Sequence, residues 1–142
     1  MTITEQQLDN EPILSVKDIK TYFFTTQGVV KAVDGISFSI RRGEVVGLVG
    51  ESGCGKSMAS LSVMRRVPQP SGKTISGEIL FHGQDLLKIS EEEMRSIRGD
   101  RIAMIMQDPM VALNQLLTVE YQIGEIFRYH KKPIIDSLRE MC

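Results

Sequence analysis

Residues 50–57 constrain the fold of this chain more than any other feature. They read Gly-Glu-Ser-Gly-Cys-Gly-Lys-Ser and match the pattern G-x-x-x-x-G-K-[ST] at every fixed position. From average residue usage, the odds that a chain of this length matches the pattern by chance are about one in two hundred. The pattern functions where a buried strand ends and a helix begins, and the sequence supplies an apolar run at 44–49 and helically spaced Met58, Leu61 and Met64. An α/β fold with a phosphate-binding loop is therefore predicted.

The fixed positions of this loop have separate physical roles. Gly50, Gly53 and Gly55 allow backbone conformations in which successive amides point at one anion. The helix that follows adds free N–H groups and the positive end of its dipole. Lys56 reaches the β- and γ-phosphates as a mobile charge, and the Ser57 hydroxyl is a ligand for Mg²⁺. The residues predicted to contact a nucleoside triphosphate are Gly50, Glu51, Ser52, Gly53, Cys54, Gly55, Lys56 and Ser57.

Composition narrows the class of partner. The 142 residues include 17 Lys and Arg against 18 Asp and Glu, a balance that argues against a dedicated nucleic-acid-binding module. No apolar run approaches the roughly 20 residues that span a bilayer, and the polar N-terminus lacks the features of a secretion signal. Cys54 and Cys142 form neither a metal-ligand spacing nor a disulfide framework, which favours a reducing compartment.

Hydrophobic patterning predicts a β-rich first part followed by alternating strands and helices. The expected strands are 13–24 and 29–33 joined by a turn at 25–28, then 36–40, 44–49, 78–81 and 102–106. The runs 44–49 and 102–106 are continuously apolar, which is typical of strands buried on both faces. The expected helices are 58–67, a helix capped by Ser90 and Glu93 that ends near Arg98, and an amphipathic helix over 118–130.

Four segments together resemble the ATP-binding subunits of ABC transporters. They are 47–57, 32–38 with 42–44, 76–86, and 102–110 with Leu113 and Asn114. The last of these resembles the Q-loop region of the oligopeptide, dipeptide and nickel importer branch, although Gln115 stands where that pattern often has proline. The resemblance covers about 13–127. It implies the P-loop NTPase core of an ABC ATP-binding domain, preceded by an antiparallel β subdomain, with ATP and Mg²⁺ as cofactors.

Two site residues follow from this resemblance alone. Gln107 matches the Q-loop glutamine, which would reach the Mg²⁺ together with Ser57. Phe23 matches the aromatic residue that stacks on adenine, and Tyr22 is the neighbouring alternative. Packing in the core is the competing role for Phe23, and ending a strand at a turn is the competing role for Gln107.

The resemblance also implies the function and the partners. We expect an ATP-binding subunit at the cytoplasmic face of the membrane, coupling ATP binding and hydrolysis to uptake of peptides or similar small solutes. Its partners would be transmembrane permease subunits, a second ATP-binding subunit and, indirectly, an extracytoplasmic solute-binding protein, with no nucleic acid. A less favoured hypothesis is another P-loop NTPase in which 103–106 is the Walker B strand and Asp108 holds Mg²⁺. It explains two of the four segments.

Several features of the family are missing from the 142 residues. The sequence contains no Leu-Ser-Gly-Gly-Gln signature, no apolar run ending in Asp-Glu and no switch histidine. We therefore expect the N-terminal half of an ATP-binding domain at 12–127, between a polar lead-in at 1–11 and a poorly packed tail at 128–142. Whether the chain is an enzyme is left open. Without a general base or a completed dimer face, stabilisation of the transition state cannot be assembled, so we expect the chain to bind ATP weakly, if at all, and not to hydrolyse it at a meaningful rate. The alternative function is a truncated, hydrolysis-incompetent nucleotide-binding remnant.

Overall fold

The computed structural model describes residues 11–108 and 113–130. These fall into two units, 1–89 and 90–142, that are described separately. Residues 1–10 of the predicted polar lead-in and most of the predicted tail lie outside the described residues, as do Pro109 and Met110 of the predicted Q-loop segment. The division after Ile89 has no counterpart in the predicted domain boundaries, which remain a prediction.

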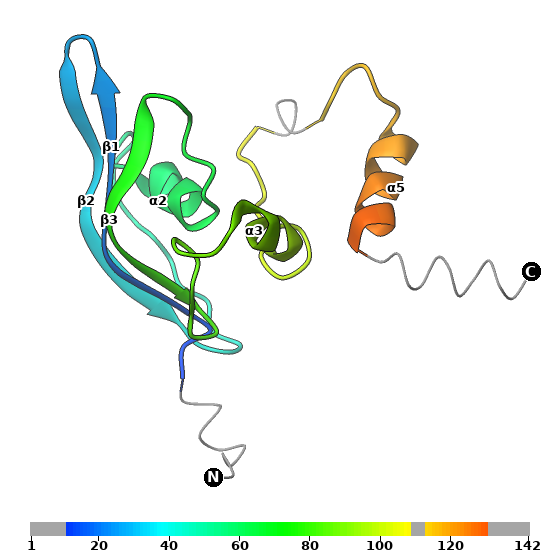
Figure 1. The fold of residues 1–142 in the computed structure, drawn as a ribbon, viewed down its shortest axis with the longest axis horizontal. Helices are drawn as coiled ribbons and strands as arrows, with labels where there is room; N and C mark the ends of the chain where they lie inside the picture. The colour runs from blue at the N-terminus through cyan, green and yellow to red at the C-terminus, as the bar shows by residue number, and fades with distance from the viewer. Residues whose placement is uncertain (1–10, 109–112, 131–142) are drawn as a thin grey trace, which may run out of the picture. The chain divides into compact units, whose positions relative to one another are not determined.

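The first unit is built on an antiparallel sheet, as the sequence predicted. Strands β1 (Leu14–Thr25), β2 (Gly28–Ile40), β3 (Gly72–Phe81) and β4 (Gln84–Asp85) lie in the order β2-β1-β3-β4, and every neighbouring pair is antiparallel (Figure 1). Neighbours in sequence can pair through short turns, and the β1–β2 turn is closed by the Thr25 hydroxyl, which donates to the Gly28 carbonyl at 2.8 Å. The two predicted strands at 29–33 and 36–40 form one strand, β2, with local irregularities in its pairing.

Helix α2 (Lys56–Val63) packs on the sheet through buried side chains. The Ser62 and Thr21 hydroxyls lie 2.7 Å apart, and both residues are fully buried. The surrounding core of this unit contains Val16, Ile19, Val33, Ala59, Val63, Val67, Ile79, Phe81 and Leu86. The helix ends before the predicted residue 67 because Met64 is its C-cap and Arg65 adopts a positive φ of 50°.

The two predicted fully buried strands are not strands in the structure. Residues 44–49 and 103–106 belong to no sheet, and Val45, Val49 and Ile105 are 95–97% exposed. A strand that is apolar on both faces needs parallel neighbours and covering helices. Among the described residues, the sheet pairs are all antiparallel and the single parallel contact is an isolated bridge between Arg98 and Ile102. The prediction of buried strands at these positions was therefore wrong for this chain.

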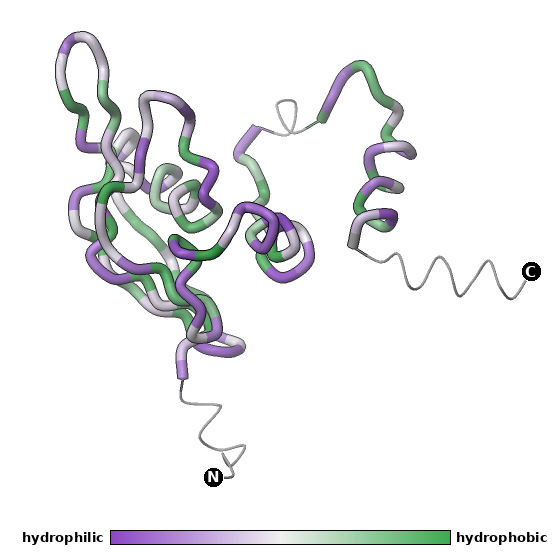
Figure 2. The backbone as a smooth tube through the Cα atoms, in the orientation of Figure 1, coloured by the Kyte–Doolittle hydropathy of each residue, from purple (hydrophilic) through white to green (hydrophobic). Residues whose placement is uncertain are grey.

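The second unit contains α3 (Glu91–Ile97) and α5 (Val119–His130). The predicted capping box of α3 is present: the Ser90 hydroxyl accepts from the Glu93 amide at 3.2 Å, and the Glu93 carboxylate accepts from the Ser90 amide at 2.9 Å. Ile123 and Phe127 of α5 are more than half exposed. The segment before α5 includes apolar residues (Figure 2), and Leu113, Leu116 and Leu117 there are also exposed. No described helix is long and apolar enough to cross a membrane.

Candidate nucleotide-binding site

The loop at 50–57 leads directly into α2, as its sequence required. Gly55 is the N-cap of α2, with a positive φ of 94°, and Lys56 is the first helical residue. A Cβ on Gly55 would lie 2.2 Å from the carbonyl oxygen of Ala32 in β2. Both the backbone conformation and the neighbouring strand therefore exclude a side chain at this position.

The ammonium group of Lys56 is held inside the curve of the loop. Its Nζ atom donates to the carbonyl oxygens of Gly50 at 2.7 Å and Glu51 at 2.6 Å, and lies 3.4 Å from the Sγ atom of Cys54. A Cβ on Gly50 would meet that same sulfur at 2.6 Å, so the loop is tightly closed. The positive charge is thus placed beside the N-terminus of α2, where both the charge and the helix dipole favour an anion.

A cavity of about 340 Å³ lies between this loop and β2. Its lining includes Gly55 and Lys56 on one side, Leu48 and Val49 before the loop, and the β2 residues 31–34. The loop borders a space of ligand size.

A cluster of charged and aromatic side chains stands at the β2 side of this cavity. The Lys31 ammonium lies 3.1 Å from the Asp34 carboxylate and 5.4 Å from the centre of the Tyr22 ring, and the Tyr22 hydroxyl donates to Asp34. These contacts lower the pKa of Asp34, first through the hydrogen bond from Tyr22 and then through the one from Lys31. The hydrogen bonds to Asp34 raise the pKa values of Lys31 and Tyr22.

The sequence analysis did not single out Lys31 and Asp34 as site residues. They join the loop only because β2 passes beside it, which local sequence does not encode. One local signal exists, the adjacent apolar residues Ala32 and Val33, which interrupt the alternation expected of a half-buried strand.

The family model described as "ABC transporter" matches residues 33–141. The chain belongs to this family. The dipeptide transport ATP-binding protein DppD of Bacillus subtilis is 51% identical over 122 residues, which are 86% of this chain and 36% of that protein. A probable peptide ABC transporter ATP-binding protein, y4tR of Sinorhizobium fredii, is 47% identical over 83% of this chain and 35% of its own length. This ABC transporter chain therefore spans about a third of the curated relatives it matches.

A solved structure supports the predicted fold class. The bacterial ABC transporter cassette MJ0796 matches with a TM-score of 0.60 at 24% identity, over 74% of this chain and 42% of that chain. The described fold is accordingly that of part of an ABC cassette: an antiparallel sheet with the phosphate loop and its helix.

Phe23, which was assigned from the family resemblance, does not line the loop cavity. The Phe23 ring lies against Gly72, whose added Cβ would be 2.8 Å from the Phe23 Cε1 atom. Tyr22, the alternative, is engaged with Lys31 and Asp34. Phe23 is not among the residues that line the cavity, so its contact with adenine stays a prediction.

The metal site also stays a prediction. Ser57 is the second residue of α2 in the first unit, whereas Gln107 is exposed in the second unit. Among the described residues, no group of three or more His, Cys, Asp or Glu side chains is arranged to hold a metal ion. A hydroxyl and phosphate oxygens suit Mg²⁺, which binds through few protein ligands.

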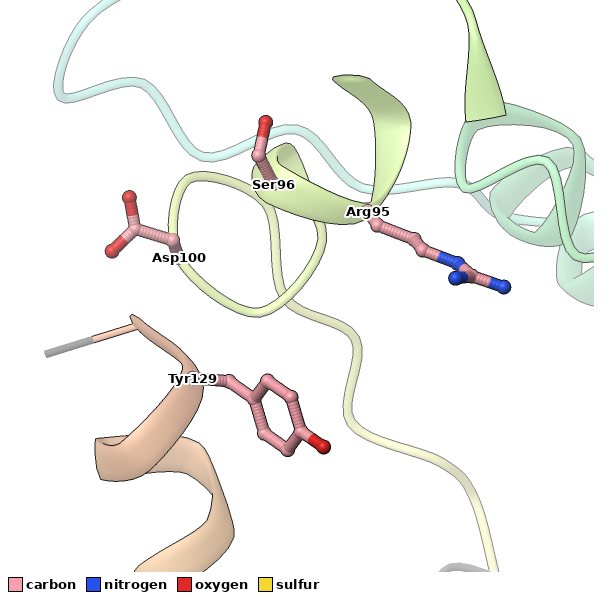
Figure 3. A pocket seen from close by; sticks show the side chains of 4 residues that line it. All are labelled: Arg95, Ser96, Asp100 and Tyr129. Carbon is pink, nitrogen blue, oxygen red and sulfur yellow. The ribbon is translucent and has the colours of Figure 1, made fainter. Parts of the chain in front are cut away.

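A second cavity, of about 370 Å³, lies within the second unit. Arg95, Ser96, Asp100 and Tyr129 line it (Figure 3). The Arg95 side chain points away from the Asp100 carboxylate, and the Ser96 hydroxyl donates to the Glu93 carbonyl of its own helix. Its polar groups do not converge on one point, so it is not a candidate site.

Proposed function

We propose that residues 50–57 bind the phosphates of ATP, with Ser57 and Gln107 as ligands of the accompanying Mg²⁺ and Phe23 beside the adenine. The observation that carries this proposal is the closed loop at the N-terminus of α2, with the Lys56 ammonium held by the carbonyls of Gly50 and Glu51. A nucleotide phosphate would replace these carbonyls as the acceptor for the Lys56 ammonium. A hydrogen bond between a charged donor and a charged acceptor is stronger than one from the same donor to a neutral carbonyl.

We further propose that this sequence belongs to an ATP-binding subunit that powers uptake of peptides or similar small solutes. The names of the relatives support this, since they include dipeptide and oligopeptide transport ATP-binding proteins. Such a subunit would lie at the cytoplasmic face of the membrane with permease subunits, a second ATP-binding subunit and, indirectly, a solute-binding protein.

For the 142 residues alone, we propose nucleotide binding without turnover. Their sequence contains neither the Leu-Ser-Gly-Gly-Gln signature nor an apolar run ending in Asp-Glu that would supply a general base. The family match over residues 33–141 supports the ABC interpretation over the rival hypothesis with Asp108 as the Walker B residue. Nothing in the structure favours that rival.

The binding test uses the ¹⁵N-labelled chain titrated with ATP and Mg²⁺ and followed by amide chemical shifts, which detect weak binding. We expect shifts concentrated at 53–57, and Lys56→Ala should weaken binding at least about tenfold because it removes a charged donor. Lys88→Ala is the matched control, because Lys88 is an exposed lysine paired with Asp85 outside the cavity. Equal affinity of the wild type and Lys56→Ala would contradict the proposal.

Turnover is tested separately by steady-state phosphate release. We expect the wild-type rate to equal that of Lys56→Ala. A wild-type rate well above background that Lys56→Ala abolishes would show that the 142 residues are a competent ATPase.

A further inference from the structure

The pairing of β1 with β2 contains an irregularity beside the phosphate loop. Thr21 pairs with Val33 and Tyr22 pairs with Lys31, so Ala32 is an extra residue in β2. This is a β-bulge, a feature that redirects side chains and is common next to active sites. The carbonyl oxygen of Ala32 is also the atom that excludes a side chain at Gly55. The bulge is therefore the point at which β2 contacts the loop.

Lys31 comes directly before the bulged residue. Among the described residues, Lys31 and Lys56 are the two lysines that line the cavity beside the loop. Its ammonium is held by Asp34 at 3.1 Å, and the side chains of Lys31 and Asp34 are 58% and 45% exposed. An ion pair with this exposure contributes little free energy, so its partners exchange readily.

We propose that Lys31 is a second cation of the nucleotide site, exchanging the Asp34 carboxylate for a phosphate oxygen when a nucleoside triphosphate occupies the loop. This inference rests on the proposed nucleotide binding at 50–57. Lys31 lines the same cavity as Lys56, and its flexible four-carbon stem allows the ammonium to move to a new partner. The Asp34 carboxylate lines this cavity too, and its negative charge would repel a bound phosphate unless the Lys31 ammonium lay between them. Asp34 then acts as a competitor that holds Lys31 beside Tyr22 until the nucleotide arrives.

The proposal predicts opposite effects for the two members of the pair. At low ionic strength, Lys31→Met should weaken binding of ATP with Mg²⁺ about fivefold, and Lys31→Arg should restore most of it. Asp34→Asn should strengthen binding about threefold, because it removes both the competitor and a like charge. When Asp34→Asn is combined with Lys31→Met, a substantial part of the gain in affinity should be lost, because no Lys31 ammonium remains to be released.

The nucleotide series identifies which part of the ligand Lys31 contacts. Adenosine carries the same base and ribose but no phosphate, so Lys31→Met should change adenosine binding less than about twofold. Lys88→Met is the matched control, since Lys88 forms a pair at the same sequence separation with Asp85, outside the cavity. Thermal melts of all variants confirm that each is folded before its affinity is compared.

The outcomes separate the inference from the function on which it rests. If Lys56→Ala loses binding while Lys31→Met and Asp34→Asn match the Lys88→Met control, Lys31 is not a ligand and the nucleotide site stands. Equal losses for ATP and adenosine in Lys31→Met overturn phosphate contact. If the wild type produces no shifts with ATP and Mg²⁺, both proposals fall.

Discussion

The antiparallel sheet and the segment 44–49 both contain many apolar residues, yet these residues are buried in the sheet and exposed in the segment. In the sheet, Val16, Ile19 and Ile79 are at most 2% exposed. In the segment, Val45 and Val49 are almost completely exposed. The difference lies in where the hydrogen-bonding neighbours come from, because antiparallel strands pair with the next strand through a short turn, whereas parallel strands require distant segments.

The phosphate loop stands between these two regions. Its glycines and Lys56 follow the exposed segment, and its helix packs on the sheet through Ser62 and Thr21. The loop conformation is therefore supported from the helix side and from β2, at the contact between Gly55 and Ala32. This explains how a closed loop coexists with an unpaired segment before it.

The largest expected effect compares truncations in the two regions. Ile79→Ala removes a side chain that is 0% exposed and should lower the free energy of unfolding by about 2–5 kcal/mol. Val45→Ala, at 95% exposure, should change it by less than about 0.5 kcal/mol. Urea unfolding followed by far-UV circular dichroism measures both. Equal costs would show that 44–49 is packed in solution.

The next comparison uses two glycines with positive φ. Gly55→Ala should cost about 2 kcal/mol of stability, because the conformation is strained and the Cβ would strike the Ala32 carbonyl. Gly43→Ala, with φ 71° and nothing within 4 Å of the added Cβ, should cost about 1 kcal/mol from strain alone. Urea midpoints of the two variants give the difference. A Gly43 variant as unstable as the Gly55 variant would remove the role assigned to β2.

A smaller effect tests a purely local signal, the capping box of α3. Hydrogen bonds from the Ser90 amide and hydroxyl lower the pKa of Glu93 below its ordinary value of 4.5. Its carboxylate therefore stabilises α3 at neutral pH, and this stabilisation disappears as the pH falls through the lowered pKa. Glu93→Ala should lower the free energy of unfolding at neutral pH, because the Ser90 amide loses its acceptor.

A pH titration of helicity from neutral to about pH 2 checks the sign of that effect, because the ordinary carboxyl range lies near pH 4. Glu93→Gln retains an acceptor but has no carboxyl group to titrate, so its helix signal should lack this acid-dependent step. A wild-type helix signal that grows as the pH falls through this range would contradict the assignment.

The smallest effect on stability is expected for a charge placed in the exposed segment 44–49, where self-association should change instead. Val45→Lys places a charge on an exposed apolar segment and should leave the free energy of unfolding within about 0.5 kcal/mol of the wild type. It should also reduce self-association measured by light scattering, because unpaired apolar segments favour edge-to-edge contacts. Unchanged scattering together with a large loss of stability would mean that Val45 is buried in solution.

Sequence reasoning succeeded where the signal is local. The alternating strands, the turn at 25–28 and the Ser90–Glu93 box all depend on residues a few positions apart, and the structure contains each of them. A helix follows the phosphate loop as expected, although it begins at Lys56 and not at residue 58. It failed at 44–49 and 102–106, where hydrophobicity indicates burial but does not say which strands will cover it. It also missed Lys31 and Asp34, which line the loop cavity because β2 passes beside the loop.

The sequence by itself determined the phosphate loop, since the pattern at 50–57 encodes the glycine conformations, the helix start and the lysine charge in consecutive residues. Only the tertiary structure decided that the bulge at Ala32 closes against Gly55 and that Lys31, Asp34 and Tyr22 form a cluster at the cavity. The physical reason is that conformational preferences act between near neighbours in the chain, whereas steric exclusion and ion pairing act between groups near in space, and folding alone brings these together.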